Sequence, residues 1–164
     1  MTHLMGKFLL YIFIIFTYIV GCQSNAKQKN GTDLMKYGIP YTIVAPDDVT
    51  LTKIGSGTLS DVNIKNNRGY DVQVYMSDAY TADLAKLKQM KKDQVIEHPQ
   101  FSKIVEEFDN GFLYEKQADD GNRSFDFMII KVQGDKEINF QAGNSKPFTE
   151  TDAKSMIQSV LKGH

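Results

Sequence analysis

The chain has one cysteine, no tryptophan and only four prolines among its 164 residues. A single cysteine can form neither an internal disulfide nor a cysteine-based zinc site, and so little proline excludes a proline-rich or collagen-like protein. The formal net charge of −1 provides no broad cationic surface, so no nucleic-acid partner is expected. With 41% hydrophobic and 24% charged residues, the composition is that of an ordinary globular protein with one domain.

Residues that carry catalysis are also scarce. Of the three histidines, His3 and His164 lie near the two ends of the chain, and only His98 lies well inside it. A Ser–His–Asp arrangement would have to use His98, yet no serine stands in a Gly-x-Ser-x-Gly motif. His98 also precedes a proline in a polar segment, which is typical of an exposed turn. No phosphate-binding glycine loop is present, so the sequence predicts no catalytic residue and no cofactor.

Metal ligands do not cluster in the sequence. The segment Asp119-Asp120-Gly121-Asn122 suggests calcium, but it lacks the alternating aspartates and the closing glutamate of an EF-hand loop. A hairpin turn is the favoured interpretation. Glu106 and Glu107 are neighbours, so on a strand they would point to opposite faces and could not work as an acid/base pair. We therefore expect no metal site.

The N-terminus has the pattern of a targeting segment. A short, weakly basic start ending at Lys7 is followed by thirteen uncharged residues, 8–20, with the sequence FLLYIFIIFTYIV. This run is shorter than the roughly 20 residues that a membrane-spanning helix requires, and it has the size of a signal-peptide core. Residues 1–21 are therefore predicted to be a signal peptide.

The end of this segment resembles the lipobox of bacterial lipoproteins. Ile19, Val20 and Gly21 lead directly to Cys22, the only cysteine of the chain. A thiol can take a diacylglycerol as a stable thioether, and a small preceding residue gives the signal peptidase access to the bond. The resemblance implies that Cys22 becomes the lipidated first residue of the mature protein, held in the membrane by two or more acyl chains such as palmitate. The alternatives are an uncleaved anchor and an ordinary signal peptide with a chance cysteine.

A polar segment separates this cysteine from the predicted domain. Residues 22–36 are poor in large apolar side chains, which predicts a tether, and a single α+β domain is expected over 37–164. Gln23 stands where an aspartate would retain an enterobacterial lipoprotein in the inner membrane. The sequence therefore favours the bacterial cell envelope, on the periplasmic face of the outer membrane where the bacterium has two membranes.

Alternating hydrophobicity predicts an antiparallel sheet of strands joined by tight turns. In residues 70–76 apolar and polar positions alternate, as in a strand with one buried face. Residues 123–132 are apolar on both faces, so this strand should lie centrally between helices. Residues 101–108 fit a strand or a helix, and the hairpin signal Asp109-Asn110-Gly111 favours a strand. Further strands are expected at 41–45, 49–54, 59–65, 112–114 and 137–142.

Two amphipathic helices are predicted. The first is expected over 77–92 with Ser77 as N-cap, Tyr80 on its apolar stripe and four lysines in its second half. Those lysines indicate a solvated face that complements the helix dipole or, less favoured, a patch for lipid headgroups. The second is expected over 149–161, where Thr149 begins a capping-box-like arrangement. Its stripe follows helical spacing and consists of Ala153, Met156, Ile157, Val160 and Leu161.

Behind a lipobox, this order of elements resembles the DcrB-like bacterial lipoproteins, which have the PsbP-like fold. The resemblance covers roughly residues 37–162 and depends on the order of strands and helices, the Asp-rich segment 77–83 and the closing helix over 153–161. It implies an α/β/α sandwich around an antiparallel meander sheet. It also implies an accessory or scaffolding role, since the family supplies such proteins more often than enzymes.

Three functions are compatible with these observations. The favoured one is a membrane-anchored, non-catalytic envelope protein that binds another protein as an accessory or interaction module. The second is a tethered binder of a small apolar ligand or lipid, in a sheet–helix cleft lined by tyrosines. The third is a hydrolase or metal enzyme, which would need His98 buried in a pocket within hydrogen-bond reach of a carboxylate.

Overall fold

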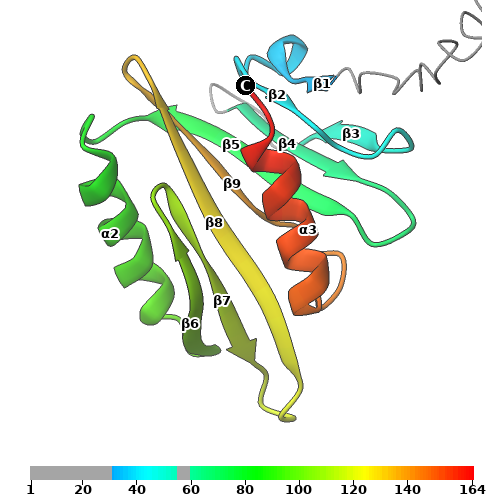
Figure 1. Ribbon diagram of the computed structural model, residues 1–164, viewed down its shortest axis with the longest axis vertical. Coiled ribbons are helices and arrows are strands. Elements are labelled where there is room, and N and C mark those ends of the chain that lie inside the picture. The colour runs from blue at the N-terminus through cyan, green and yellow to red at the C-terminus, as the bar shows by residue number, and fades with distance from the viewer. Residues whose placement is uncertain (1–30, 55–59) are drawn as a thin grey trace, which may run out of the picture.

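The computed structural model describes residues 31–54 and 60–164 (Figure 1). Their fold is α+β: a seven-stranded antiparallel sheet with two helices packed on it, as the sequence predicts. The elements in chain order are β1 (Thr32–Asp33), the 3-10 helix η2 (Met35–Tyr37), β2 (Thr42–Ile43), β3 (Thr50–Lys53), β4 (Ser60–Lys65), β5 (Asp71–Asp78), α2 (Leu84–Ile96), β6 (Phe101–Phe108), β7 (Gly111–Gln117), β8 (Arg123–Gln133), β9 (Lys136–Ala142) and α3 (Glu150–Leu161).

The large sheet has the strand order β3-β4-β5-β9-β8-β7-β6. All but one of its pairs of neighbouring strands are also consecutive in the chain. The exception is the antiparallel pairing of β5 with β9, in which Val74 lies opposite Phe140. These strands are neighbours in the sheet although α2 and β6–β8 lie between them in the chain. The residues expected at 41–45 and 49–54 do not pair with each other, because β2 joins β1 in a separate two-stranded sheet.

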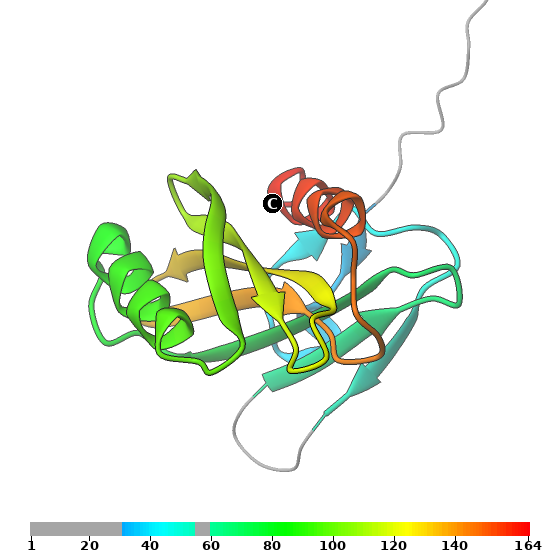
Figure 2. The ribbon, with the colours of Figure 1, turned by 90° about the horizontal axis from the view of Figure 1, so that it is seen from below.

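Strand β8 lies centrally and is covered on both faces, as its two apolar faces predict. Phe127 and Ile129 belong to the larger hydrophobic cluster with α3, whereas Met128 and Ile130 belong to a smaller cluster with Leu87 of α2. Successive residues of a strand point to opposite faces, so the two helices pack on opposite faces of β8. In the end-on view of Figure 2, strands of the β6–β8 part of the sheet lie between the two helices.

Helix α3 forms where the sequence predicts it. Thr149 caps its start, accepting a hydrogen bond from the Asp152 backbone N–H, while the Asp152 carboxylate accepts one from the Thr149 backbone N–H. The predicted stripe is buried at Ala153, Met156 and Ile157, and again at Val160. This stripe packs on β8 and β9 and makes α3 the main cover of the larger cluster.

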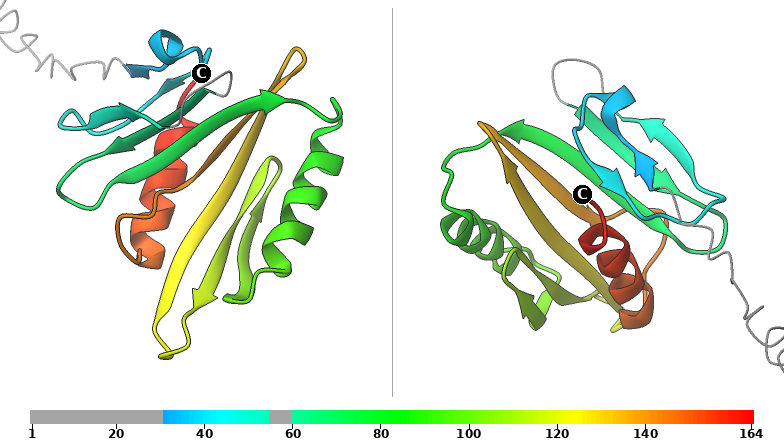
Figure 3. Two further views of the ribbon diagram at one scale, coloured as in Figure 1. Left: turned by 180° about the vertical axis from the view of Figure 1, so that it is seen from behind. Right: turned by 45° about the horizontal axis from the view of Figure 1, so that its top comes forward.

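The folded domain begins earlier than expected. Leu34 is fully buried in the larger cluster, and its backbone N–H donates to the Tyr41 carbonyl. The Tyr41 hydroxyl donates to the Val160 carbonyl at 2.6 Å, and the backbone of His164 pairs with that of Thr42. Residues 32–36, predicted to be tether, are therefore part of the domain, and the C-terminal residues lie beside β2 (Figure 3).

The prediction for the first helix is wrong at its start. Strand β5 continues to Asp78, which pairs with Lys136, and Ser77 bonds to Glu137 of β9 instead of capping a helix. The helix starts at Leu84, and its N-cap is Asp83, whose carboxylate accepts the Lys86 N–H. The local sequence does not reveal that β9 extends far enough to keep this segment in the sheet.

Residues 101–108 form a strand, as the hairpin signal indicates. The carboxylates of Glu106 and Glu107 point to opposite sides, since Glu106 pairs with Lys154 of α3 and Glu107 with Lys92 of α2. A glycine is needed at position 111, directly after the turn, because a Cβ there would collide with the Met128 carbonyl. The edge strand β6 is thereby attached to both helices by ion pairs.

Candidate functional site

The lipobox lies outside the described residues. Ile19, Val20, Gly21 and Cys22 therefore remain sequence predictions. Among residues 31–54 and 60–164, no helix is both long and apolar enough to cross a membrane. Within the same ranges no three His, Cys, Asp or Glu side chains come together as metal ligands.

A hollow lies on the α2 side of the sheet, and we call it the α2 cleft. It has a volume of about 350 Å³ and opens beside the last turn of α2. The connection from α2 to β6 contributes His98 and Gln100, and the strands β7, β8 and β9 contribute Lys116, Asp126 and Gln141. Polar groups from distant segments thus converge on one hollow, as in a ligand site.

The cleft exists because α2 is shorter than the strands beneath it. On this face of β8, Met128, Ile130 and Val132 contact the small cluster under α2. The next position on the same face is Asp126, which lines the cleft. A carboxylate directly before three apolar positions on this face is the signal by which the sequence could have indicated this site.

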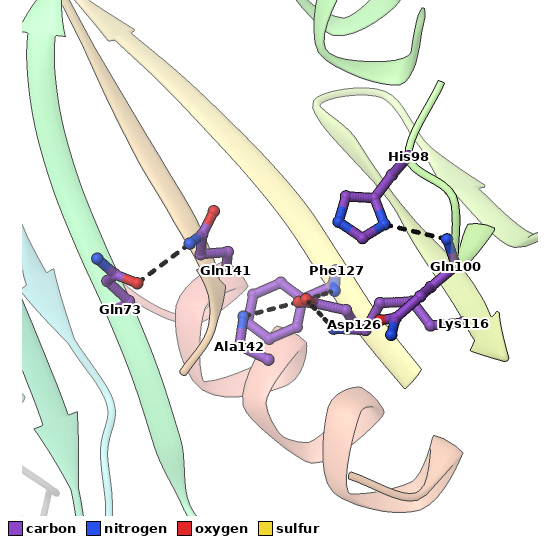
Figure 4. A network of polar contacts seen from close by, with 8 residues as sticks. All are labelled: Gln73, His98, Gln100, Lys116, Asp126, Phe127, Gln141 and Ala142. Atoms are coloured by element: carbon purple, nitrogen blue, oxygen red, sulfur yellow. Dashed lines mark hydrogen bonds and ion pairs between the residues drawn. The ribbon is translucent and has the colours of Figure 1, made fainter. Parts of the chain in front are cut away.

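Asp126 is held rigidly at the base of the cleft (Figure 4). Its Oδ1 accepts the backbone N–H groups of Phe127 at 2.7 Å and Ala142 at 3.0 Å, and its Oδ2 accepts from the Lys116 ammonium at 3.0 Å. Burial, together with the Asp126 carboxylate, raises the pKa of the neighbouring Tyr114 phenol. The carboxylate is therefore committed to structural partners, and its charge is balanced by Lys116.

His98 is exposed in the turn after α2, as the sequence predicts. Its Nδ1 accepts the Gln100 backbone N–H at 3.2 Å, and Figure 4 shows the other ring nitrogen turned away from Gln100. In the described residues its hydrogen bonding involves no carboxylate. The buried histidine–carboxylate pair that the enzyme hypothesis requires is not formed, although His98 and Asp126 line the same cleft.

A row of side chains sets the orientation of the Gln141 amide. The Asp61 carboxylate accepts from the Gln73 Nε2 at 3.1 Å, so the Gln73 oxygen is left to accept the Gln141 Nε2, also at 3.1 Å. The Gln141 Oε1, at the end of this row, therefore remains available to accept a hydrogen bond. This orientation depends on three strands, β4, β5 and β9, so the sequence gives no indication of it.

Three of the four α2 lysines form neither a solvated face nor a headgroup patch, whereas Lys86 is exposed. Lys91 contacts the buried Glu137 carboxylate at 2.9 Å, and Lys88 and Lys92 pair with Glu107 of β6. All three lysine side chains are mostly buried, with 18–22% exposed. These ion pairs join the helix to the sheet. The local sequence does not reveal them, because the acidic partners lie later in the chain.

The tyrosines do not surround one apolar cavity. Tyr41 and Tyr70 belong to the larger cluster, where the Tyr70 hydroxyl contacts the Ser159 hydroxyl at 2.6 Å. Tyr75 and Tyr114 lie on the α2 side, and Tyr80 is 73% exposed. Of this set, Tyr114 lines the α2 cleft, and Tyr70 lines hollows beside α3.

The chain has no match among protein-family models, curated proteins or solved structures. The resemblance to DcrB-like lipoproteins therefore stays a prediction from the sequence.

Proposed function

We propose that this protein is a lipid-anchored component of the bacterial cell envelope whose domain acts by binding a partner and not by catalysis. The observation that carries the proposal is the position of the only cysteine, directly after the thirteen-residue apolar run and the residues Ile19-Val20-Gly21. Acyl chains on Cys22 would hold the protein at a membrane. Gln23 favours the periplasmic face of the outer membrane in a bacterium with two membranes.

The start of the fold supports a short connection to the membrane. Strand β1 begins at Thr32, ten residues after Cys22. Ten residues span at most about 35 Å even when fully extended. The domain would therefore stay close to the bilayer, where it can meet other envelope components.

The arrangement of the domain supports binding at its far end. The N-terminal strands and the C-terminus lie at one end of the sheet, whereas the α2–β6 and β7–β8 connections lie at the other (Figures 1 and 3). The α2 cleft opens beside the α2–β6 connection. An anchor at the first end would leave the cleft facing away from the membrane.

The chemistry of the cleft favours recognition over catalysis. The Asp126 carboxylate is occupied by two backbone N–H groups and by Lys116, so it is poorly placed to accept a proton from a substrate. His98 is exposed and has no carboxylate to orient it in the described residues. An accessory or interaction module, as in the DcrB-like lipoproteins, is the function that these features support best.

The proposal is tested by replacing the cysteine in the bacterium. The Cys22→Ala variant should lose incorporation of a labelled fatty acid and appear in the soluble fraction or as uncleaved precursor. The neighbouring Ser24→Ala variant is the matched control and should remain labelled and membrane-bound. Mass spectrometry that finds an unmodified Cys22 on a chain still carrying Met1 would refute the anchor.

A further inference from the structure

We infer that the α2 cleft binds an N-acetylated sugar. This inference rests on the proposed binding function and names the ligand class of that site. In this cleft, donors, acceptors and aromatic rings from α2, β6, β7, β8 and β9 converge.

The charge balance of the cleft favours a neutral ligand. The Lys116 ammonium and the Asp126 carboxylate lie 3.0 Å apart and compensate each other. Their side chains are only 27% and 11% exposed, so a charged ligand would have to compete for one member of a shielded pair. A neutral ligand can hydrogen-bond to the pair without separating it.

The polar groups of the cleft match those of an amide-bearing sugar. The Gln141 Oε1 is an acceptor for an N–H group or a hydroxyl. With Nδ1 accepting the Gln100 N–H, neutral His98 carries its proton on Nε2, which can donate to a carbonyl or hydroxyl oxygen. Gln94 and Asn144 add amides that both donate and accept.

The apolar part of the cleft is formed by aromatic rings. Phe101 and Tyr114 both line it, with ring centroids 6.5 Å apart, and Val95 of α2 lies beside them. A sugar ring has hydroxyls around its edge and C–H groups on its faces, so one face can pack on aromatic carbon while the edge bonds to amides. The acetamido group adds a methyl, an N–H and a carbonyl, for which the cleft has complementary groups.

The dimensions agree with a short saccharide. A volume of about 350 Å³ is at the small end of the range of about 300–1,000 Å³ that is usual for ligand pockets. This suits one or two sugar rings. The cleft opens beside the α2–β6 connection, which lies at the end opposite to the N-terminal strands (Figure 1). This position would direct the cleft toward glycan outside the membrane.

The test is calorimetric titration of the full chain with N-acetylglucosamine and, as matched sugar without the acetamido group, glucose. N-acetylglucosamine should bind severalfold more tightly than glucose. Gln141→Leu removes the free acceptor and should weaken binding about tenfold. Gln133→Leu changes an exposed glutamine at the other end of β8 and should leave binding unchanged.

His98→Ala provides a second variant if Gln141→Leu fails to fold, because His98 is exposed in a turn. It should weaken binding severalfold. Equal affinities of wild type, Gln141→Leu and His98→Ala would place the sugar elsewhere and overturn the assignment of the cleft. No binding of either sugar, or binding of a tripeptide probe in their place, would overturn the ligand class. Either result leaves the anchor proposal standing, since that depends on Cys22→Ala alone.

Discussion

The two faces of the sheet are built in different ways. On the α3 side, a continuous apolar cluster joins the N-terminal segment, the sheet and the stripe of α3. On the α2 side, the buried apolar cluster consists of Leu87, Phe112, Met128 and Ile130. Partly buried apolar residues such as Leu84 and Val95 add to this contact. Ion pairs join Lys88, Lys91 and Lys92 to strand carboxylates, and beyond them lies the polar cleft.

The difference indicates a division of roles between the two faces of the sheet. Apolar burial is the dominant favourable contribution to folding, so the α3 side should determine the stability of the domain. The α2 side leaves polar groups accessible near the helix end, which suits a binding site. Matched substitutions on the two faces can test this division.

The largest effect is expected from truncating the larger core. Ile157→Ala on α3 should lower the free energy of unfolding by about 4 kcal/mol, because the tightly surrounded site cannot collapse onto the cavity. Leu87→Ala on α2 should cost about 2–3 kcal/mol, since its cluster is small and lies beside a hollow. Urea denaturation monitored by circular dichroism measures both. A greater loss for Leu87→Ala would reverse the comparison.

A clear loss of stability is also expected in alkali. Burial, with the Glu137 and Asp61 carboxylates nearby, raises the pKa of Tyr75 to about 12. In the unfolded chain the same phenol ionises near pH 10. Between pH 10 and 12 the folded state therefore retains the phenol proton that the unfolded state loses. The stabilisation by this phenol is therefore complete below pH 10 and declines as the pH rises through 12.

Urea midpoints between pH 9 and 12 measure this decline. Tyr75→Phe should make it shallower, whereas the exposed Tyr80→Phe should leave it unchanged. An identical decline in wild type and in Tyr75→Phe would contradict the assignment to Tyr75.

A smaller effect is expected from the ion pairs that attach α2. Glu137→Gln leaves the Lys91 ammonium without its carboxylate partner and should cost about 2 kcal/mol, because both side chains are largely shielded from water. Glu107→Gln should cost less, since that carboxylate is 45% exposed and water can replace it. Hydrogen exchange should show faster exchange in α2 than in α3 for Glu137→Gln. Equal acceleration in both helices would mean that Glu137 stabilises the whole domain.

The smallest effect is expected at the helix caps. Thr149→Ala removes the cap of α3 and Asp83→Ala the cap of α2, each costing about 1 kcal/mol. Loss of the α3 cap should lower the global urea midpoint. If the division holds, loss of the α2 cap should chiefly accelerate hydrogen exchange within α2. A fall in the midpoint for Asp83→Ala as large as that for Thr149→Ala would show that the two faces unfold as one unit.

The sequence predicts more of the fold than of the candidate site. The predicted turn before Gly111, the strand at 101–108 and the capping box at Thr149 are confirmed, because each depends on residues close together in the chain. The α2 cleft combines His98, Lys116, Asp126 and Gln141 from separate elements. The start of α2 was missed for a similar reason, since Asp78 stays in the sheet through its pairing with Lys136.

From the sequence alone came the strand and helix periodicities, the central position of residues 123–132 and the prediction of an anchor at Cys22. Local dihedral preferences, caps and hydrophobic spacing carry that information. The tertiary structure alone decided that β9 pairs with β5, that the α2 lysines meet carboxylates of β6 and β9, and that polar groups converge beyond the end of α2. These features depend on contacts between residues far apart in the chain, which no local pattern encodes.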